Sequence, residues 1–254
     1  MNDFANEHIF WTKKAKETLK IPVIASLNCI NKDTWIEYSK RMQDIGVDGL
    51  ELNFYALPGG FAKTADEVEK EQLSTIEILK KTINIPIAIK LSPFYTAPLN
   101  FISKLDNLGV DAVVLFNRLF YPDIAVDLED NTFPIDYSLK NENKLPLKFV
   151  GLLYSHIEAS ICASTGIADW QDMAKMFLAG ADCIQVVSAV YKNGNDYIKE
   201  MLNGFTKWMM IKGYKSISDF QGKLSAKNNS DSTVYQRSQY INILMRKNPF
   251  ENLI

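Results

Sequence analysis

Polar residues that follow short apolar runs are the first chemical signal in this sequence. Six runs end in hydroxyls, amides or a cation: Ser26 and Asn28, Asn53, Lys90 and Ser92, Asn117 and Arg118, Ser164 and Thr165, and Ser188. The set contains no carboxylate pair and no histidine. A single Asn after a strand is usually a turn residue, but six polar ends together favour a site. Amides, hydroxyls and one lysine suit a flat heteroaromatic ligand with carbonyl and N–H edges better than hydrolysis.

The apolar runs themselves predict the strands that carry these residues. They lie at about 21–28, 48–53, 85–91, 111–117, 158–164 and 181–188. Continuous apolar runs are typical of a parallel sheet that is buried on both faces.

A repeated pattern precedes three of these strands. Gly46–Asp48, Gly109–Asp111 and Gly180–Asp182 each consist of Gly, a small apolar residue and Asp, and each follows a segment with helical periodicity. Glycine after a helix supplies its left-handed cap, so each unit is a helix that leads into a strand. Alternating helices and strands predict an α/β fold of the (β/α)8 barrel family, with six of the eight strands visible. Ligands bind at the carboxyl ends of barrel strands, where the polar residues lie.

Composition excludes several other classes of protein. The chain has 254 residues, and 28 Lys and Arg against 30 Asp and Glu give a net charge of −2, so no basic field is available to hold nucleic acid. Three cysteines and two histidines predict neither a disulfide framework nor a metal site. No apolar run reaches the ~18 residues that span a bilayer. We expect a soluble, unprocessed, cytoplasmic protein without a membrane or nucleic-acid partner.

Two late loops have the character of an anion site. Ser164-Thr165-Gly166 lies between a strand and a helix with a predicted N-cap at Asp169, and Val187-Ser188 ends the last strand. Backbone N–H groups in such loops bind anions, and the loops after the last two barrel strands frequently bind phosphate. An ordinary turn is the alternative interpretation of the Ser-Thr-Gly segment.

An ordered set of motifs resembles the dihydroorotate dehydrogenase family. The motifs are Ile24-Ala25-Ser26-Leu27-Asn28, Leu50-Glu51-Leu52-Asn53, Ile89-Lys90-Leu91-Ser92-Pro93, Val114-Leu115-Phe116-Asn117-Arg118, Ala163-Ser164-Thr165-Gly166, and Gly213 to Leu224. The resemblance covers about residues 7 to 246. It implies an FMN-containing barrel that transfers a hydride between a carbon–carbon bond of a pyrimidine and the flavin.

The resemblance also implies roles for individual residues. Asn28, Asn53 and Lys90 would face the flavin ring, and Ser26 would be a further cofactor-binding residue. Lys90 would place positive charge near the pyrimidine side of the flavin, which favours the reduced anionic flavin. Asn53 and Asn117 would bind the substrate ring, while Ser164, Thr165, Gly166, Val187 and Ser188 would hold the ribityl phosphate. An alternative for Lys90 is a simple ion pair with a neighbouring acid.

The sequence departs from the family pattern at three points. Ala56 occupies the position of the cysteine that removes the substrate proton in the soluble class, and Tyr55 beside it is the tentative acid or base, with a lid or packing role as the alternative. Thr165 stands where a second glycine is usual. The family's first two strand and helix units have no counterpart before residue 21.

These departures leave competing hypotheses. One is a truncated, non-catalytic or partner-dependent relative that binds flavin weakly or not at all; another is a sugar-phosphate isomerase or aldolase barrel, which His8 and His156 do not support. Open sheet edges predict a homo-oligomer or a partner that supplies the missing units. We expect a partial barrel over 1–224 with a lid-like insertion at 118–150, then a linker and helix over 225–254.

Overall fold

The computed structural model describes residues 2–29, 31–54, 61–229, 235 and 245. Tyr55, Ala56 and most of the predicted C-terminal segment lie outside the described residues. The chain divides into two compact units. Unit 1 comprises residues 1–137 and 157–165, and unit 2 comprises residues 138–156 and 166–254.

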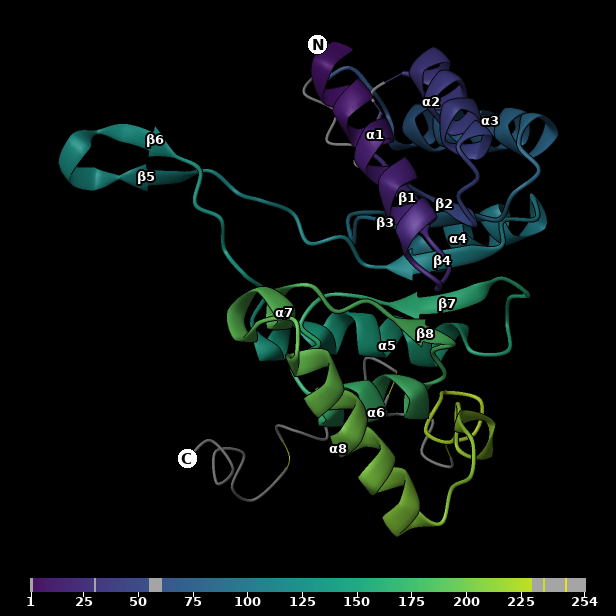
Figure 1. Cartoon of the computed structure of the whole chain (residues 1–254), viewed down its shortest axis with the longest axis vertical. Coiled ribbons are helices and arrows are strands. Elements are labelled where there is room, and N and C mark those ends of the chain that lie inside the picture. The colour runs from purple at the N-terminus through teal and green to yellow at the C-terminus, as the bar shows by residue number, and fades with distance from the viewer. Residues whose placement is uncertain (1, 30, 55–60, 230–234, 236–244, 246–254) are drawn as a thin grey trace. The chain divides into compact units, whose positions relative to one another are not determined.

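Unit 1 is built on a parallel sheet (Figure 1). Its strands, in sheet order, are β1 (Ile24–Leu27), β2 (Gly49–Phe54), β3 (Ile87–Leu91), β4 (Ala112–Leu115) and β7 (Ser160–Ala163). The helices of unit 1 are α1 (Asn2–Thr18), α2 (Lys32–Asp44), α3 (Ala65–Thr82) and α4 (Pro98–Asn107). Each strand from β1 to β3 is followed by a helix and then by the neighbouring parallel strand, which is the order of an α/β barrel.

Unit 2 contributes the sixth strand and the later helices. These are β8 (Cys183–Ile184), α5 (Lys144–Leu153), α6 (Trp170–Ala179), α7 (Ser188–Asn193) and α8 (Tyr197–Lys212), with 3-10 turns at Lys140–Asn143 and Ile217–Asp219. Its core is rich in aromatic residues, because Phe177, Phe205, Trp208 and Phe220 pack in edge-on, tilted and stacked pairs with ring centroids 5.1 to 6.2 Å apart. The prediction of an α/β fold of the (β/α)8 barrel family with six strands is confirmed. None of the helices that the structure describes combines the length and apolar composition needed to cross a bilayer.

The two faces of the sheet in unit 1 differ in chemistry. Strand alternation gives one face Leu50, Leu52, Ile87 and Ile89, all at most 1% exposed. The opposite face carries Ser26, Glu51, Asn53, Lys90 and the half-buried Ala88. Strand β2 is largely buried on both faces, as the apolar runs predicted, whereas β1 alternates exposed and buried residues, and the polar residues gather on one face of the sheet.

The repeated aspartates have a structural role. Asp48 accepts hydrogen bonds from the backbone N–H of Val23 at 2.7 Å and from Lys16 Nζ at 2.6 Å. Asp111 does the same one unit later, accepting from the Ile87 N–H at 2.8 Å and from Lys80 Nζ at 3.0 Å. Each carboxylate thus fixes the start of the neighbouring strand, which explains why Asp follows the helix-ending glycine.

Several boundaries differ from the predicted ones. The last strand ends at Ile184, so Ser188 is the first residue of α7 and does not end a strand. Helix α1 was not predicted; Arg41 of α2 donates to Asn6 of α1 at 2.7 Å. Within the predicted insertion, β5 (Asp123–Ala125) and β6 (Asp130–Thr132) form an antiparallel hairpin joined by a 3-10 turn at Val126–Leu128.

Candidate functional site

Three polar side chains meet on the polar face of the sheet in unit 1. Ser26 Oγ of β1 donates to Glu51 Oε1 of β2 at 3.1 Å, and Lys90 Nζ of β3 lies 3.5 Å from the same oxygen. The side chains of Lys90 and Glu51 are 16% and 9% exposed. The alternative in which Lys90 pairs with a neighbouring acid is therefore confirmed, and the acid is Glu51.

Asn53 stands directly opposite Lys90 in the parallel register. Its Oδ1 is buried and accepts no hydrogen bond from any residue that the structure describes. Burying an amide oxygen without a donor costs about 1–3 kcal/mol, so such an atom in a folded chain needs an explanation. An acceptor of this kind is suited to an N–H group of a ligand.

Asn28 and Asn117 lie just beyond the carboxyl ends of β1 and β4. Asn28 follows β1 and is exposed, while the half-buried Asn117 follows β4 and donates its backbone N–H to the Leu91 carbonyl at 2.8 Å. Cys29 lies next to Asn28, and burial raises the pKa of its thiol, partly offset by a hydrogen bond with Thr34. A raised pKa keeps this thiol protonated and makes it a poor nucleophile.

The Ser-Thr-Gly loop has an unusual backbone. Ser164 is buried, and its N–H donates to the Leu115 carbonyl at 2.7 Å. Thr165 and Gly166 have φ values of +78° and +72°. The Thr165 hydroxyl donates to the Phe116 carbonyl at 2.8 Å, which removes that hydrogen as a ligand donor and gives the non-glycine residue a reason to hold this conformation.

Gly166 itself belongs to unit 2 and is tightly enclosed there. A Cβ on Gly166 would lie 2.4 Å from the Asn143 backbone nitrogen. Glycine is therefore required at this position for both conformation and space. Asp169 caps α6 by accepting from the Asp172 N–H at 3.0 Å, which confirms the predicted N-cap.

The second predicted phosphate segment also lies in unit 2. Val187 is 58% exposed and precedes α7, and the Ser188 hydroxyl accepts a hydrogen bond from the Ser138 N–H at 3.0 Å. Lys192 of the same helix donates to the Ser138 carbonyl at 3.1 Å. These contacts fix the start of α7; the phosphate role of Val187 and Ser188 stays a prediction.

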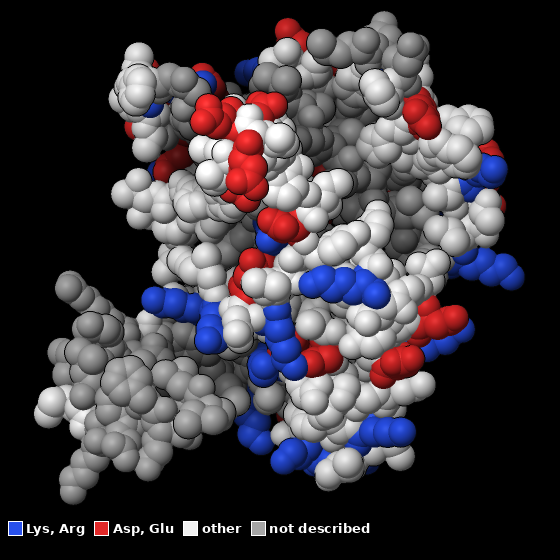
Figure 2. All heavy atoms as spheres, turned by 90° about the vertical axis from the view of Figure 1, so that its left-hand side faces the viewer, with Lys and Arg blue, Asp and Glu red and all other residues white. Residues whose placement is uncertain are grey.

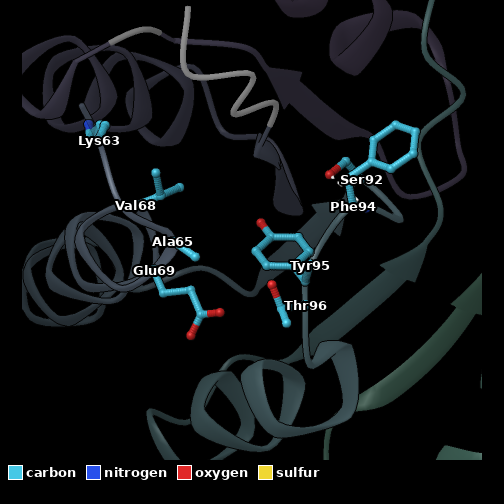
Figure 3. A pocket seen from close by; sticks show the side chains of 8 residues that line it. All are labelled: Lys63, Ala65, Val68, Glu69, Ser92, Phe94, Tyr95 and Thr96. Carbon is cyan, nitrogen blue, oxygen red and sulfur yellow. Dashed lines mark hydrogen bonds between the residues drawn. The ribbon is translucent and has the colours of Figure 1, made fainter. Parts of the chain in front are cut away.

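A cavity of about 220 Å³ lies beyond the carboxyl end of β3 (Figure 3). Its lining includes Ser92, Tyr95 and Thr96 from the segment after β3, and Glu69 from α3. Glu69 pairs with Lys104 at 3.2 Å, and the Tyr95 hydroxyl donates to Gln72 at 2.9 Å. Burial raises the pKa of the Tyr95 phenol, so it stays a hydrogen donor at neutral pH. Ser92, one of the polar residues expected at the strand ends, lines this cavity, whereas none of the described residues to which the resemblance gives an individual role does.

Glu51 is the residue that the sequence reasoning missed. The signal was present, because Glu51 lies two residues before Asn53 and strand alternation puts both on one face. Glu51 lies inside a strand between Leu50 and Leu52, so a pattern of polar residues at strand ends does not include it. In the described part of the chain, no group of three His, Cys, Asp or Glu side chains is arranged to hold a metal ion.

Comparison with known proteins agrees with the motif pattern. The family model for dihydroorotate dehydrogenase matches residues 2–209, a range that contains every predicted site residue. A protein named putative dihydroorotate dehydrogenase A (fumarate), from Aeropyrum pernix, is 25% identical over 212 residues, which are 81% of this chain and 68% of that protein. The catalytic subunits named dihydroorotate dehydrogenase B (NAD(+)) from Methanosarcina acetivorans and Pyrococcus horikoshii are 28% and 26% identical over 217 and 230 residues. Those alignments cover 82% and 86% of this chain, and 68% and 71% of the relatives.

Proposed function

The chain belongs to the dihydroorotate dehydrogenase family, and from this premise we propose that it is an FMN-dependent oxidoreductase acting on a carbon–carbon bond of a small planar, pyrimidine-like substrate. The observation that carries the proposal is the unpartnered Asn53 Oδ1 beside the Ser26, Glu51 and Lys90 group.

The residues present fit a flavin. Asn53 offers a buried acceptor, and Lys90 offers an ammonium donor on the same face of the sheet. Flavin rings present both carbonyl oxygens and an N–H, so they take one donor and one acceptor side by side. We propose that Ser26, Asn28, Asn53 and Lys90 hold the ring, with Ser164, Thr165, Gly166, Val187 and Ser188 serving the phosphate.

Bound FMN would supply the ring that accepts a hydride from the substrate. Lys90 would donate hydrogen bonds to the ring from an ammonium group that Glu51 holds in position. Since Glu51 carries the opposite charge 3.5 Å away, the two side chains are formally neutral together, and Lys90 acts more as a directed donor than as an unpaired cation. Ser26 in turn donates to the Glu51 carboxylate and limits its rotation.

Asn53 and Asn117 are proposed to bind the substrate ring. Both are half-buried and carry amides, which offer a donor and an acceptor to a planar ring edge. Tyr55 is the proposed acid or base, because Ala56 has no group that takes a proton.

Flavin binding can be tested with the full chain. Purified protein is expected to show the visible absorbance of bound FMN or to take up FMN on titration. Asn53→Ala should weaken uptake about 3- to 10-fold, the loss of roughly one hydrogen bond, whereas the exposed Asn107→Ala should not. A colourless chain that takes up no FMN would refute the proposal.

Substrate choice needs a separate measurement. Positioned general bases contribute about 10²–10⁴-fold, so turnover of dihydroorotate should be slow without the cysteine at position 56. Tyr55→Phe should lower it further, and Ala56→Cys should raise it. Fast dihydroorotate oxidation that survives Tyr55→Phe would contradict the role given to Tyr55.

One observation favours a second candidate function, a relative that binds flavin weakly or needs a partner. The described residues contain six barrel-type strands, and the sheet edge at β1 pairs only with β2. An edge strand of this kind invites association. We therefore propose a homo-oligomer or a partner that completes the barrel. We propose a cytoplasmic location, in agreement with three cysteines of which none forms a disulfide.

A further inference from the structure

The cavity beyond the carboxyl end of β3 is lined by residues of unit 1 alone. Residues between 63 and 69, at the start of α3, form one wall, and residues between 92 and 96 form the other (Figure 3). Its volume of about 220 Å³ lies below the range of about 300–1,000 Å³ that is usual for drug-sized ligands. The cavity therefore suits a smaller molecule than a flavin.

Glu69 is the acidic side chain of this cavity. Figure 2 shows exposed Asp and Glu side chains on the side from which the β5 and β6 hairpin projects, where water and salt screen each carboxylate. The Glu69 side chain is only 15% exposed. Its Oε2 accepts from Lys104 Nζ at 3.2 Å, and no residue that the structure describes donates to its Oε1. A mostly buried carboxylate oxygen without a donor favours a ligand that brings one.

The start of α3 does not favour an anion in the cavity. A helix N-terminus attracts negative charge, but Glu67 already fills this role, because it accepts from the Thr64 N–H at 2.7 Å in a capping box. Lys63 already pairs with Glu71, and Figure 3 shows it apart from Glu69. An anionic ligand would therefore meet the Glu69 carboxylate, whereas a cationic ligand would be attracted to it.

Three oxygens of the lining can accept hydrogen bonds from one cation. Besides Glu69 Oε1, these are the phenol oxygen of Tyr95 and the hydroxyl oxygen of Thr96. The Tyr95 hydroxyl donates to Gln72 at 2.9 Å, so its oxygen can still accept. A primary ammonium has three N–H donors, which matches this set. A guanidinium forms its paired hydrogen bonds with both oxygens of a carboxylate, and Lys104 already occupies one of them.

We propose that this cavity binds a small primary amine in its protonated form. The ammonium lies at Glu69, Tyr95 and Thr96, and a short carbon chain packs against Ala65 and Val68 of the α3 wall. The inference does not depend on flavin, and its test uses no activity.

The test is a titration of the full chain with n-butylammonium, followed by saturation-transfer NMR of the ligand. The wild type should bind it with a Kd of about 1 mM, as expected for a ligand of five heavy atoms. n-Butanol, butyrate and n-butylguanidinium keep the four-carbon chain. Each should bind at least about fivefold more weakly, because none of them carries three N–H donors on one cationic nitrogen.

Two substitutions should move the affinity in opposite directions. Glu69→Gln should weaken n-butylammonium binding at least about tenfold, because it removes the charge that attracts the ligand. Lys104→Met should tighten binding about threefold, because it frees the second Glu69 oxygen and removes a competing cation. Glu77→Gln, at an exposed acid further along α3, is the matched control and should leave the affinity unchanged.

Thermal unfolding checks the fold of each variant. Should Glu69→Gln fail to fold, Lys104→Met still decides, because the Lys104 side chain is 45% exposed. The proposal would be overturned if n-butylammonium showed no saturable binding up to about 20 mM, or if n-butanol bound as tightly. Unchanged affinity in Glu69→Gln, or no gain in Lys104→Met, would overturn it as well.

Discussion

The Glu51 and Lys90 pair allows a quantitative test of the candidate site. At 3.5 Å, two unit charges attract by about 5 kcal/mol if the effective dielectric constant is about 20. Removing both groups from water offsets much of this gain, because the pair is only 9% and 16% exposed. Contacting residues in such pairs couple by about 0.5–3 kcal/mol, and we expect a value above about 1 kcal/mol here.

The measurement is a double-mutant cycle in urea. Glu51→Gln and Lys90→Met each leave the other charge buried without this partner, so each should lower the free energy of unfolding by roughly 3 kcal/mol. The double variant should lose clearly less than the sum of the two, because neither charge remains. Unfolding midpoints with unchanged slopes give the three differences.

An exposed pair on α1 supplies the control. Lys13 and Glu17 lie 4.0 Å apart and are 59% and 64% exposed, so their coupling should stay below about 0.5 kcal/mol. If the buried pair couples no more strongly than this exposed pair, then Glu51 does not fix Lys90, and the positioning role given to Glu51 is wrong.

Two further predictions concern stability. The Lys16 ammonium and the Val23 N–H hold the pKa of Asp48 below its ordinary value of 3.8. The stability that this carboxylate contributes is complete above pH 3.8 and is lost as pH falls through its lower folded-state pKa. Asp48→Asn should therefore flatten the acid side of a plot of urea midpoint against pH, and an unchanged profile would count against the Asp48 contacts. Gly166→Ala should lower the free energy of unfolding by roughly 1–3 kcal/mol more than Gly194→Ala, because both glycines have positive φ but only Gly166 of the two is enclosed. Equal losses would show that the residues around Gly166 move enough to accommodate a methyl group.

Local sequence predicted the elements well where short-range physics determines them. Gly46 and Gly109 end their helices with φ of +83° and +75°, as the repeat required, and Asp169 caps α6. Helix α1 was missed because polar and charged residues dominate its sequence, and its contacts are polar too, such as Arg41 with Asn6. The hairpin of β5 and β6 was missed for a different reason: strands of three residues are too short to show a period of two.

The site could be predicted only in part, because pairing between strands is not visible in local sequence. Asn53 and Lys90 were identifiable as strand-end residues, but the partner of Lys90 depends on the register of β2 against β3. That register places Asn53 directly opposite Lys90, yet Lys90 lies 3.5 Å from Glu51, two residues earlier on β2. A carboxylate is a stronger acceptor for an ammonium than an amide is, so Lys90 pairs with Glu51. The Asn53 amide oxygen therefore accepts no hydrogen bond from the described residues. Glu51 therefore does more than neutralise a lysine: by holding Lys90, it leaves the Asn53 amide oxygen without that donor, which is the condition that the proposed ligand role of Asn53 requires.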